Sequence, residues 1–183
     1  MSVKLLALAA SARSESINRR LLSLAVKQAE AAGAQVTVME YADCVVPLYF
    51  GDHTDQLPEG AARLSKALRA HDGLLLATPE YNWSMPGSLK NLIDWLSTDP
   101  KAPLKGRHAL LMCASPSVRG GIMGLQQLRV PLEHLGVHVY PHVIGIGEAD
   151  IQMEEKGLSR KKDHDFLNGC ITDFIRITRA IGA

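Results

Sequence analysis

Five short apolar segments recur along the chain, and each is followed by a segment with helical periodicity. The apolar segments span residues 3–10, 36–39, 73–78, 108–114 and 138–146, and we expect a β-strand over each. Strands this apolar are typical of parallel sheets that helices cover on both faces. A chain of this kind has few ways to bury its strands, and nearly all of them are layered α/β folds.

The intervening segments carry apolar residues at three- and four-residue intervals, which predicts helices. We expect helices from residue 17 to a stop at Gly33, and over residues 58–69, 86–96, 121–135 and 163–181. Right-handed crossovers then favour a three-layer, doubly wound, flavodoxin-like fold with a five-stranded parallel sheet of order 2-1-3-4-5. The charged segment from Glu148 to Asp163 is expected to be a solvated loop, with an oligomer contact as the alternative.

Length and composition narrow the class of protein. A chain of 183 residues predicts a single domain over residues 1–183, and 46% hydrophobic residues exclude a disordered chain. The formal net charge of +1 argues against a nucleic-acid partner. No apolar run is long enough for a membrane span. Three widely spaced cysteines without a CxxC pair predict reduced thiols in a cytoplasmic protein, and we expect no metal site.

The loop after the first strand is rich in anion-binding groups. Residues 11–18 read SARSESIN and lead into a helix N-terminus, where unpaired N–H groups attract anions. Ser11, Arg13, Ser16 and Asn18 add hydroxyl, guanidinium and amide donors, which suit a phosphate. The loop has neither a GxGxxG nor a GxxxxGK[ST] motif, so a mononucleotide phosphate is favoured. The alternative is a simple helix cap by Ser14 or Ser16.

The loop after the third strand suits a planar ligand. Pro79 and Pro86 stiffen it, and Tyr81 and Trp83 provide flat apolar surface. Its polar atoms come from Glu80, Asn82 and Ser84. A heteroaromatic ring needs this combination of apolar faces and edge hydrogen bonds. The alternative is a turn in which Ser84 caps the next helix.

Three motifs together resemble a known family. The stretch PEYNWSMPGSLKNLIDWLS (residues 79–97) is similar to the signature of NAD(P)H-dependent FMN reductases, which include bacterial quinone, chromate and azo-dye reductases. SARSESIN resembles the family's phosphate loop S-x-R-x-x-S-x-N. ASPSVRGG (residues 114–121), followed by Leu128 and Arg129, resembles its third flavin-side loop. The resemblance covers nearly the whole chain.

The resemblance implies a bound FMN. The phosphate would be held by Ser11, Arg13, Ser16 and Asn18. The isoalloxazine would be lined, largely by backbone groups, by Pro79, Glu80, Tyr81 and Asn82, and bordered on its other side by Ser115, Gly120 and Gly121. Ile17 and Trp83 complete the expected cofactor-binding residues. The chain departs from the family at Ala10, where glycine is common, and over residues 115–119, where an earlier glycine is usual.

The resemblance also implies the reaction. NAD(P)H would pass a hydride to flavin N5, and a quinone, flavin or azo compound would then take two electrons. No protein side chain is expected to be catalytic. Arg119 would meet the 2′-phosphate of NADPH, or would be a solvated arginine. Cys113, inside an apolar strand, is expected to be a buried thiol. Family members are commonly homodimers or homotetramers, with Trp83, Met85 and Trp95 as a candidate contact patch.

Two other functions use the same fold and cofactor. One is a flavodoxin-type electron carrier, and the other is an FMN-binding redox sensor without enzymatic activity. Flavodoxins are acidic and lack a cation in their phosphate loop, so the charge of +1 and Arg13 argue against a carrier. A failure to oxidise NAD(P)H would favour the sensor.

Overall fold

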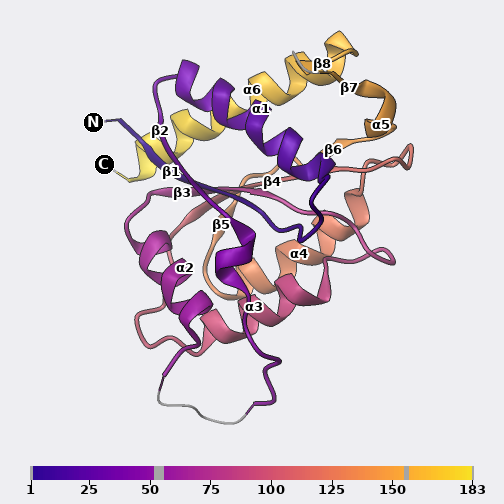
Figure 1. The fold of residues 1–183 in the computed structure, drawn as a ribbon. Helices are drawn as coiled ribbons and strands as arrows, with labels where there is room; N and C mark the ends of the chain where they lie inside the picture. Colours follow the sequence, from indigo (N-terminus) through magenta and orange to yellow (C-terminus); the bar gives the residue numbers. More distant parts are fainter. Residues whose placement is uncertain (1, 52–55, 155–156, 183) are drawn as a thin grey trace.

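The computed structural model describes residues 2–51, 56–154 and 157–182. Its sheet is parallel and follows the order β2-β1-β3-β4-β5, with β6 also paired to β4 (Figure 1). This confirms the predicted order. The strands are β1 (Lys4–Ala9), β2 (Gln35–Met39), β3 (Gly73–Ala77), β4 (His108–Ala114), β5 (His138–Val139) and β6 (Ile144–Ile146).

The last predicted strand is interrupted. β5 pairs with the start of β4, with His138 opposite His108, whereas β6 pairs with its end, with Ile144 opposite Met112. Pro141 lies in the gap and has no N–H group to donate to a neighbouring strand. The prediction of one continuous strand over residues 138–146 is therefore wrong, although both parts extend the same edge of the sheet.

Helices cover both faces of the sheet (Figure 1). α1 (Ile17–Ala31) and α6 (Lys161–Ile181) lie on one face. α2 (Glu59–Arg69), α3 (Gly87–Ser97) and α4 (Ile122–His134) lie on the other, beside the short helix η1 (Tyr41–Cys44). These bounds match the predicted helices to within a few residues.

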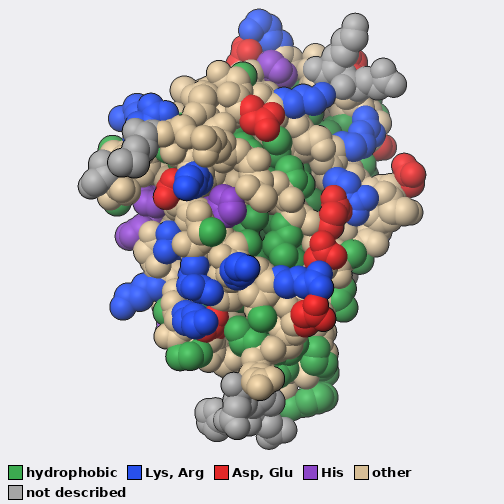
Figure 2. Space-filling view, turned by 60° about the vertical axis from the view of Figure 1, so that its left-hand side comes forward, with side chains coloured by type: hydrophobic (Ala, Val, Ile, Leu, Met, Phe, Trp, Pro, Cys, Tyr) green, Lys and Arg blue, Asp and Glu red, His purple; other side chains and the backbone are tan. Residues whose placement is uncertain are grey.

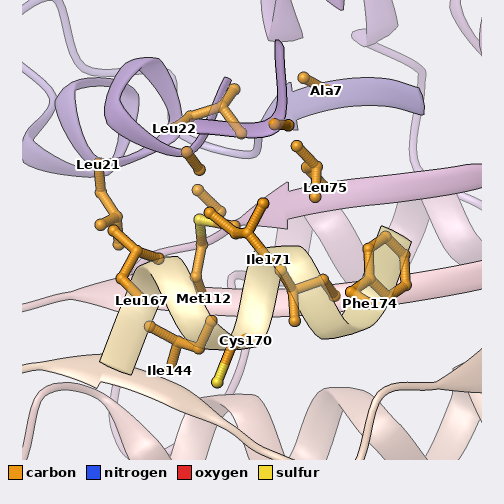
Figure 3. Close-up of a cluster of buried hydrophobic side chains, with 14 of the residues drawn as sticks. Ala7, Leu21, Leu22, Leu75, Met112, Ile144, Leu167, Cys170, Ile171 and Phe174 are labelled. Carbon is orange, nitrogen blue, oxygen red and sulfur yellow. The ribbon is translucent and has the colours of Figure 1, made fainter. Parts of the chain in front are cut away.

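Side-chain alternation along the strands builds two separate cores. In β1, Leu5 and Ala7 join the core under α1 and α6, whereas Leu6 and Leu8 join the core under α2, α3 and α4. Figure 3 shows the first core, where Ile171 and Phe174 of α6 lie close to the strands. Complete burial of one leucine stabilises the fold by about 1.5–3 kcal/mol. Apolar residues on both faces of a strand therefore require helices on both faces.

The segment after β6 is more ordered than predicted. It forms α5 (Ala149–Gln152), β7 (Met153–Glu154) and β8 (Gly157–Leu158), and residues 155–156 lie outside the described residues. The side chains of Ala149, Gln152 and Leu158 are buried. The expectation of a solvated loop is therefore wrong for the described part of this segment, and α6 begins at Lys161 instead of residue 163.

One smaller difference concerns the start of helix α3. Pro86, not Ser84, is the N-cap residue of α3. Within this helix, Lys90 and Asp94 form an ion pair, with 2.6 Å between Nζ and Oδ1. Among the described residues, no helix combines the length and the apolar character that crossing a bilayer requires.

Candidate functional site

Three loops meet at the carboxyl edge of the sheet, after β1, β3 and β4. They surround a pocket of about 120 Å³. It is lined by Ser11, Arg13, Glu15, Ser16, Ile17, Asn18, Pro79, Glu80, Tyr81, Ala114, Ser115 and Pro116. Most of the predicted binding residues thus lie around one cavity. Asn82, Trp83, Gly120 and Gly121 do not line it, and Glu15, Ala114 and Pro116 were missed although each is next to a predicted residue.

The first loop presents several unpaired donors to the pocket. Ser16 is the N-cap of α1, and its Oγ accepts a hydrogen bond from Arg19 N at 3.2 Å. The N–H groups of Ile17 and Asn18, in the first turn, donate to no acceptor in the described part of the chain. The Ser11 side chain is buried but makes no hydrogen bond with any described residue. Arg13 likewise forms no ion pair there.

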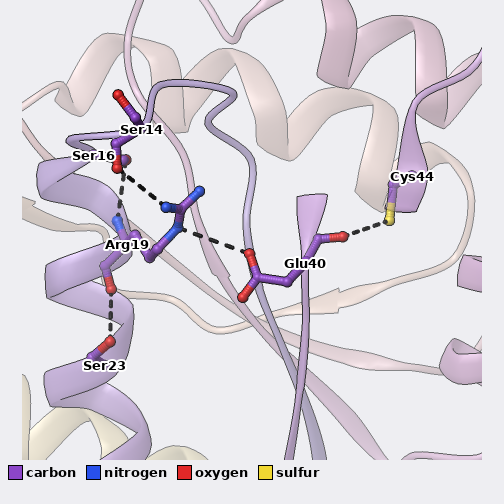
Figure 4. A network of polar contacts seen from close by, with 6 residues as sticks. All are labelled: Ser14, Ser16, Arg19, Ser23, Glu40 and Cys44. Carbon is purple, nitrogen blue, oxygen red and sulfur yellow. Dashed lines mark hydrogen bonds and ion pairs between the residues drawn. The ribbon is translucent and has the colours of Figure 1, made fainter. Parts of the chain in front are cut away.

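Arg19 fixes the far side of this loop (Figure 4). Its Nη1 donates to Ser14 O at 3.2 Å, and its Nε lies 4.0 Å from Glu40 Oε2. Ser23 Oγ donates to Arg19 O in the next turn of the helix. Arg19 is therefore committed to structure, which leaves Arg13 as the loop's unpaired cation.

Asn18 joins the first loop to the third. Its Oδ1 accepts from Ala114 N at 2.8 Å, and its Nδ2 donates to Ala114 O at 3.0 Å. The side chain is only 2% exposed. Since both polar atoms of the amide are paired with the end of β4, Asn18 positions two loops of the pocket, and its backbone N–H is its free donor.

The second loop ends in a tight hairpin turn. Tyr81 and Ser84 exchange two backbone hydrogen bonds of 2.9 and 3.0 Å. Between them, Asn82 and Trp83 have φ angles of 50° and 65°. Two left-handed residues in a two-residue turn define a type I′ geometry, which Asn adopts readily and Trp rarely. Trp83 thus occupies a strained conformation, and its side chain is 58% exposed.

Glu80 connects the second loop to α4. Its Oε2 accepts from Gly124 N at 2.7 Å, in the first turn of that helix. A carboxylate at this position satisfies an unpaired N–H group and interacts favourably with the helix dipole. The carboxylate of Glu80 is therefore already paired with Gly124, and only the backbone groups of Glu80 remain available to a ligand.

The two glycines of the third loop are required by packing. A Cβ on Gly120 would lie 2.5 Å from Gly145 C, and one on Gly121 would lie 2.2 Å from Cys113 Sγ. Both residues also have positive φ angles, of 64° and 74°. They let the chain turn closely from β4 into α4, and this role accounts for them without any ligand contact.

Cys113 is an inert thiol. Its side chain is buried, and burial together with the nearby Glu80 carboxylate raises its pKa to about 12. A thiol with this pKa is protonated at neutral pH, so it is not a nucleophile. The described residues contain no group of three or more His, Cys, Asp or Glu side chains placed to hold a metal ion.

The donor set of the pocket fits a phosphate monoester such as that of FMN. Helix N–H groups, a free buried hydroxyl and an unpaired guanidinium converge on one side, and the proline-stiffened backbone of the second loop faces them. A doubly wound sheet with this donor set at its carboxyl edge defines a mononucleotide-binding α/β protein.

Comparison with known proteins narrows this class to one family. The sequence profile of the NADPH-dependent FMN reductases matches residues 3–150, and the chain belongs to this family. Its members are oxidoreductases that use FMN and NAD(P)H.

Similar proteins support this membership. An NAD(P)H-dependent FMN reductase from Pseudomonas aeruginosa is 38% identical over 138 residues, which are 74% of this chain and 72% of that protein. The quinone reductase of Escherichia coli strain K12 is 33% identical over 134 residues, 70% of this chain and 71% of that protein. The flavoenzyme NAD(P)H:(acceptor) oxidoreductase FerB from Paracoccus denitrificans superposes with a TM-score of 0.82 at 27% identity, covering 97% of this chain and 98% of FerB.

Proposed function

We propose that this protein binds FMN in the pocket at the carboxyl edge and carries electrons from NAD(P)H to a small acceptor. The observation that carries the proposal is the convergence of unpaired donors from the first loop on the stiff backbone of the second. FMN supplies the redox chemistry by accepting a hydride and releasing two electrons. The protein binds the cofactor and leaves one face of the flavin ring open to NAD(P)H and to the acceptor.

Each loop has a distinct binding task. The phosphate is held by Ser11, Arg13, Ser16 and the N–H groups of Ile17 and Asn18. The isoalloxazine lies against Pro79, Glu80 and Tyr81, and Ser115 borders its other side. Asn82, Trp83, Gly120 and Gly121 act from outside the pocket, by shaping the turns that carry these groups.

The phosphate assignment is tested with an Arg13→Ala variant. We expect it to bind FMN about tenfold more weakly or worse, because a charge-assisted hydrogen bond is lost. Its affinity for riboflavin, which lacks the phosphate, should stay the same. Titration calorimetry with both ligands measures this, with Lys27→Ala as the control because Lys27 is an exposed cation far along α1. An equal loss for FMN and riboflavin would refute the assignment.

The acceptor is proposed to be a quinone or an azo compound. A quinone reductase and, at 28% identity, an NADPH azoreductase from Bacillus are among the relatives. Both acceptor types are planar and need only an open flavin face. Steady-state NADPH oxidation by the FMN-loaded protein should depend on added benzoquinone or azo dye. A rate that neither acceptor raises would refute this proposal.

We also propose that the protein is a cytoplasmic homodimer or homotetramer formed from one domain over residues 1–183. The three cysteines are free, which suits a reducing compartment. Trp95 is buried against Tyr49 and unavailable for a contact. A better contact surface is the segment before α2, where Val45, Leu48 and Phe50 are 71%, 62% and 79% exposed. Sedimentation velocity should show a smaller species for Phe50→Asp than for the wild type, and identical species would exclude this surface.

A further inference from the structure

Trp83 combines two features that are unfavourable for folding. Its backbone is left-handed at the second central position of the type I′ turn, where glycine is the usual residue. Its indole is more than half exposed, whereas tryptophan side chains are mostly buried in folded proteins. Glycine at this position would relieve the backbone strain and remove the exposed apolar surface. Folding therefore does not explain the tryptophan, and strained residues of this kind gather at functional sites.

The Trp83 ring contacts a cation of the third loop. The guanidinium carbon of Arg119 lies 4.8 Å from the ring centroid, within the range of a cation–π interaction. The Arg119 side chain is exposed, and it forms no hydrogen bond or ion pair with a described residue. Contact with the ring holds the guanidinium in place while its N–H groups remain free to bind an anion.

Other cations of the molecule have structural tasks that Arg119 lacks. Figure 2, turned toward the side where both termini lie, shows Lys and Arg side chains gathered with histidines beside them. Arg69 and Arg179 lie in the last turns of α2 and α6, where a positive charge offsets the negative end of a helix. Arg119 lies before the start of α4, where the helix dipole does not favour a cation.

The pair formed by Trp83 and Arg119 lies beside the proposed FMN pocket. Trp83 is two residues from Tyr81, Arg119 is four residues from Ser115, and both Tyr81 and Ser115 line that pocket. Tyr81 is 49% exposed, so its ring offers apolar surface at the same edge. The Glu80 carboxylate is held by an N–H group at the start of α4 and does not pair with Arg119. An unpaired cation and an exposed aromatic ring thus flank the pocket.

We propose that Arg119, positioned by Trp83, selects planar acceptors that carry an anionic substituent, such as a sulfonated or carboxylated quinone. This inference rests on the proposed function, because it concerns the acceptor of the same site. The guanidinium binds the anionic group, and Tyr81 supplies apolar surface for the ring. A quinone receives two electrons and two protons in this step, as a hydride from the reduced cofactor and a proton from water. It leaves as the hydroquinone, and the cofactor returns to its oxidised form.

The competing explanation is that Trp83 and Arg119 only fasten the second loop to the third. Trp83→Gly separates the two explanations by its effect on folding. If Trp83 serves Arg119, the variant should melt at the same or a higher temperature than the wild type, because glycine suits the turn. If the pair only fastens the loops, the variant should melt lower. Differential scanning calorimetry of the FMN-free protein measures this, and a lower melting temperature would overturn the role of Trp83.

The charge preference is tested by binding, without any reaction. Naphthalene-2-sulfonate and naphthalene-2-sulfonamide share one ring system, and only the sulfonate is charged at neutral pH. Calorimetry with the oxidised, FMN-loaded protein gives the ratio of their affinities. We expect this ratio to fall about fivefold in Arg119→Gln, and in the same direction in Trp83→Gly, because a charge-assisted contact is lost at an exposed site. Lys27→Gln, which removes an exposed positive charge in α1, should keep the wild-type ratio. An unchanged ratio in Arg119→Gln would overturn the proposal.

The reaction with the acceptor is tested separately from the nicotinamide donor. FMN-loaded protein is reduced with one equivalent of dithionite without oxygen and is mixed with 1,4-naphthoquinone or its 2-sulfonate. The return of the flavin absorbance gives a rate constant for each acceptor. The sulfonate-to-parent ratio of these constants should fall about fivefold from the wild type to Arg119→Gln, and comparing ratios cancels the difference in reduction potential between the quinones. An equal ratio in both proteins would overturn the proposal.

Failure of the proposed function gives a different result. A wild-type protein that neither quinone reoxidises would contradict the proposed transfer of electrons to an acceptor. The affinity ratio of the sulfonate and the sulfonamide would still decide whether Arg119 binds an anionic group, because that measurement involves no electron transfer.

Discussion

Arg119 and Trp83 meet above the carboxyl edge, from two different loops. The guanidinium carbon of Arg119 lies 4.8 Å from the centroid of the Trp83 ring. Arg119 forms no ion pair with a described residue, and its backbone N–H is held by Ser117 Oγ at 3.3 Å. A guanidinium stacked on an indole keeps its edge donors free, so it is oriented to meet an anion.

This arrangement predicts that Arg119 makes the protein favour NADPH over NADH as the hydride donor. Arg119→Ala should raise the KM for NADPH about tenfold and leave the KM for NADH nearly unchanged, because only NADPH carries a 2′-phosphate. Trp83→Ala should act in the same direction, since it removes the surface that orients Arg119. Steady-state kinetics with both donors, and the affinity for NADP⁺, measure this. An unchanged preference in both variants would make Arg119 a solvated arginine.

Residue types at the site were predictable, but their tasks were not. The motifs identified Ser11, Arg13, Pro79 and Tyr81 as residues near one ligand, and the structure places all four around one pocket. The predicted flavin contact of Gly120 and Gly121 stays a prediction, but the structure adds a packing reason for both glycines, because an added Cβ would meet Gly145 or Cys113. Contacts between residues this far apart in sequence leave no local pattern, so a sequence motif cannot separate a ligand contact from a packing constraint.

At the scale of elements, Asn18 connects helix α1 to the end of strand β4. Asn18→Ala would leave the buried N–H and C=O of Ala114 without partners. We expect it to lower the free energy of unfolding by about 2–6 kcal/mol, at about 1–3 kcal/mol for each of the two unsatisfied groups. Ser14→Ala, at an exposed side chain of the same loop, should change it by less than about 0.5 kcal/mol. Urea unfolding of the FMN-free protein measures both values. A loss below about 1 kcal/mol for Asn18→Ala would show that the hydrogen bonds between Asn18 and Ala114 contribute little to the stability of the fold.

The elements themselves were largely predictable because hydrophobic periodicity is local. Each helix packed on the sheet lies close to its predicted span. The segment after β6 was not predictable, because its charges suggested solvent. Glu148 instead pairs with Arg160, and Gln152 Nε2 donates to Gly147 O at 2.6 Å. These contacts bury apolar residues between the charged ones and fold the segment against the protein.

The whole molecule presents its two pockets at opposite edges of one sheet. The carboxyl edge carries the three loops of the proposed FMN pocket, and the amino edge carries a basic pocket lined by Lys4, Arg69, Arg107 and Arg179. The fold explains this separation, because in parallel α/β sheets all strand ends of one kind lie together. The sheet order was predictable from the alternation of strands and helices, whereas the amino-edge pocket depends on side chains from elements that only the folded chain brings together.

The central claim is that FMN bound at the carboxyl edge accepts electrons from NAD(P)H and passes them on. The most direct measurement is the visible absorption spectrum of the protein after one equivalent of FMN has been added and unbound FMN has been removed by gel filtration. NADPH and then benzoquinone are added to this sample without oxygen, and the spectrum is recorded after each addition. We predict that flavin bands remain with the protein, bleach with NADPH and return with benzoquinone. Protein that retains no FMN, or bound FMN that NADPH does not bleach, would contradict the claim.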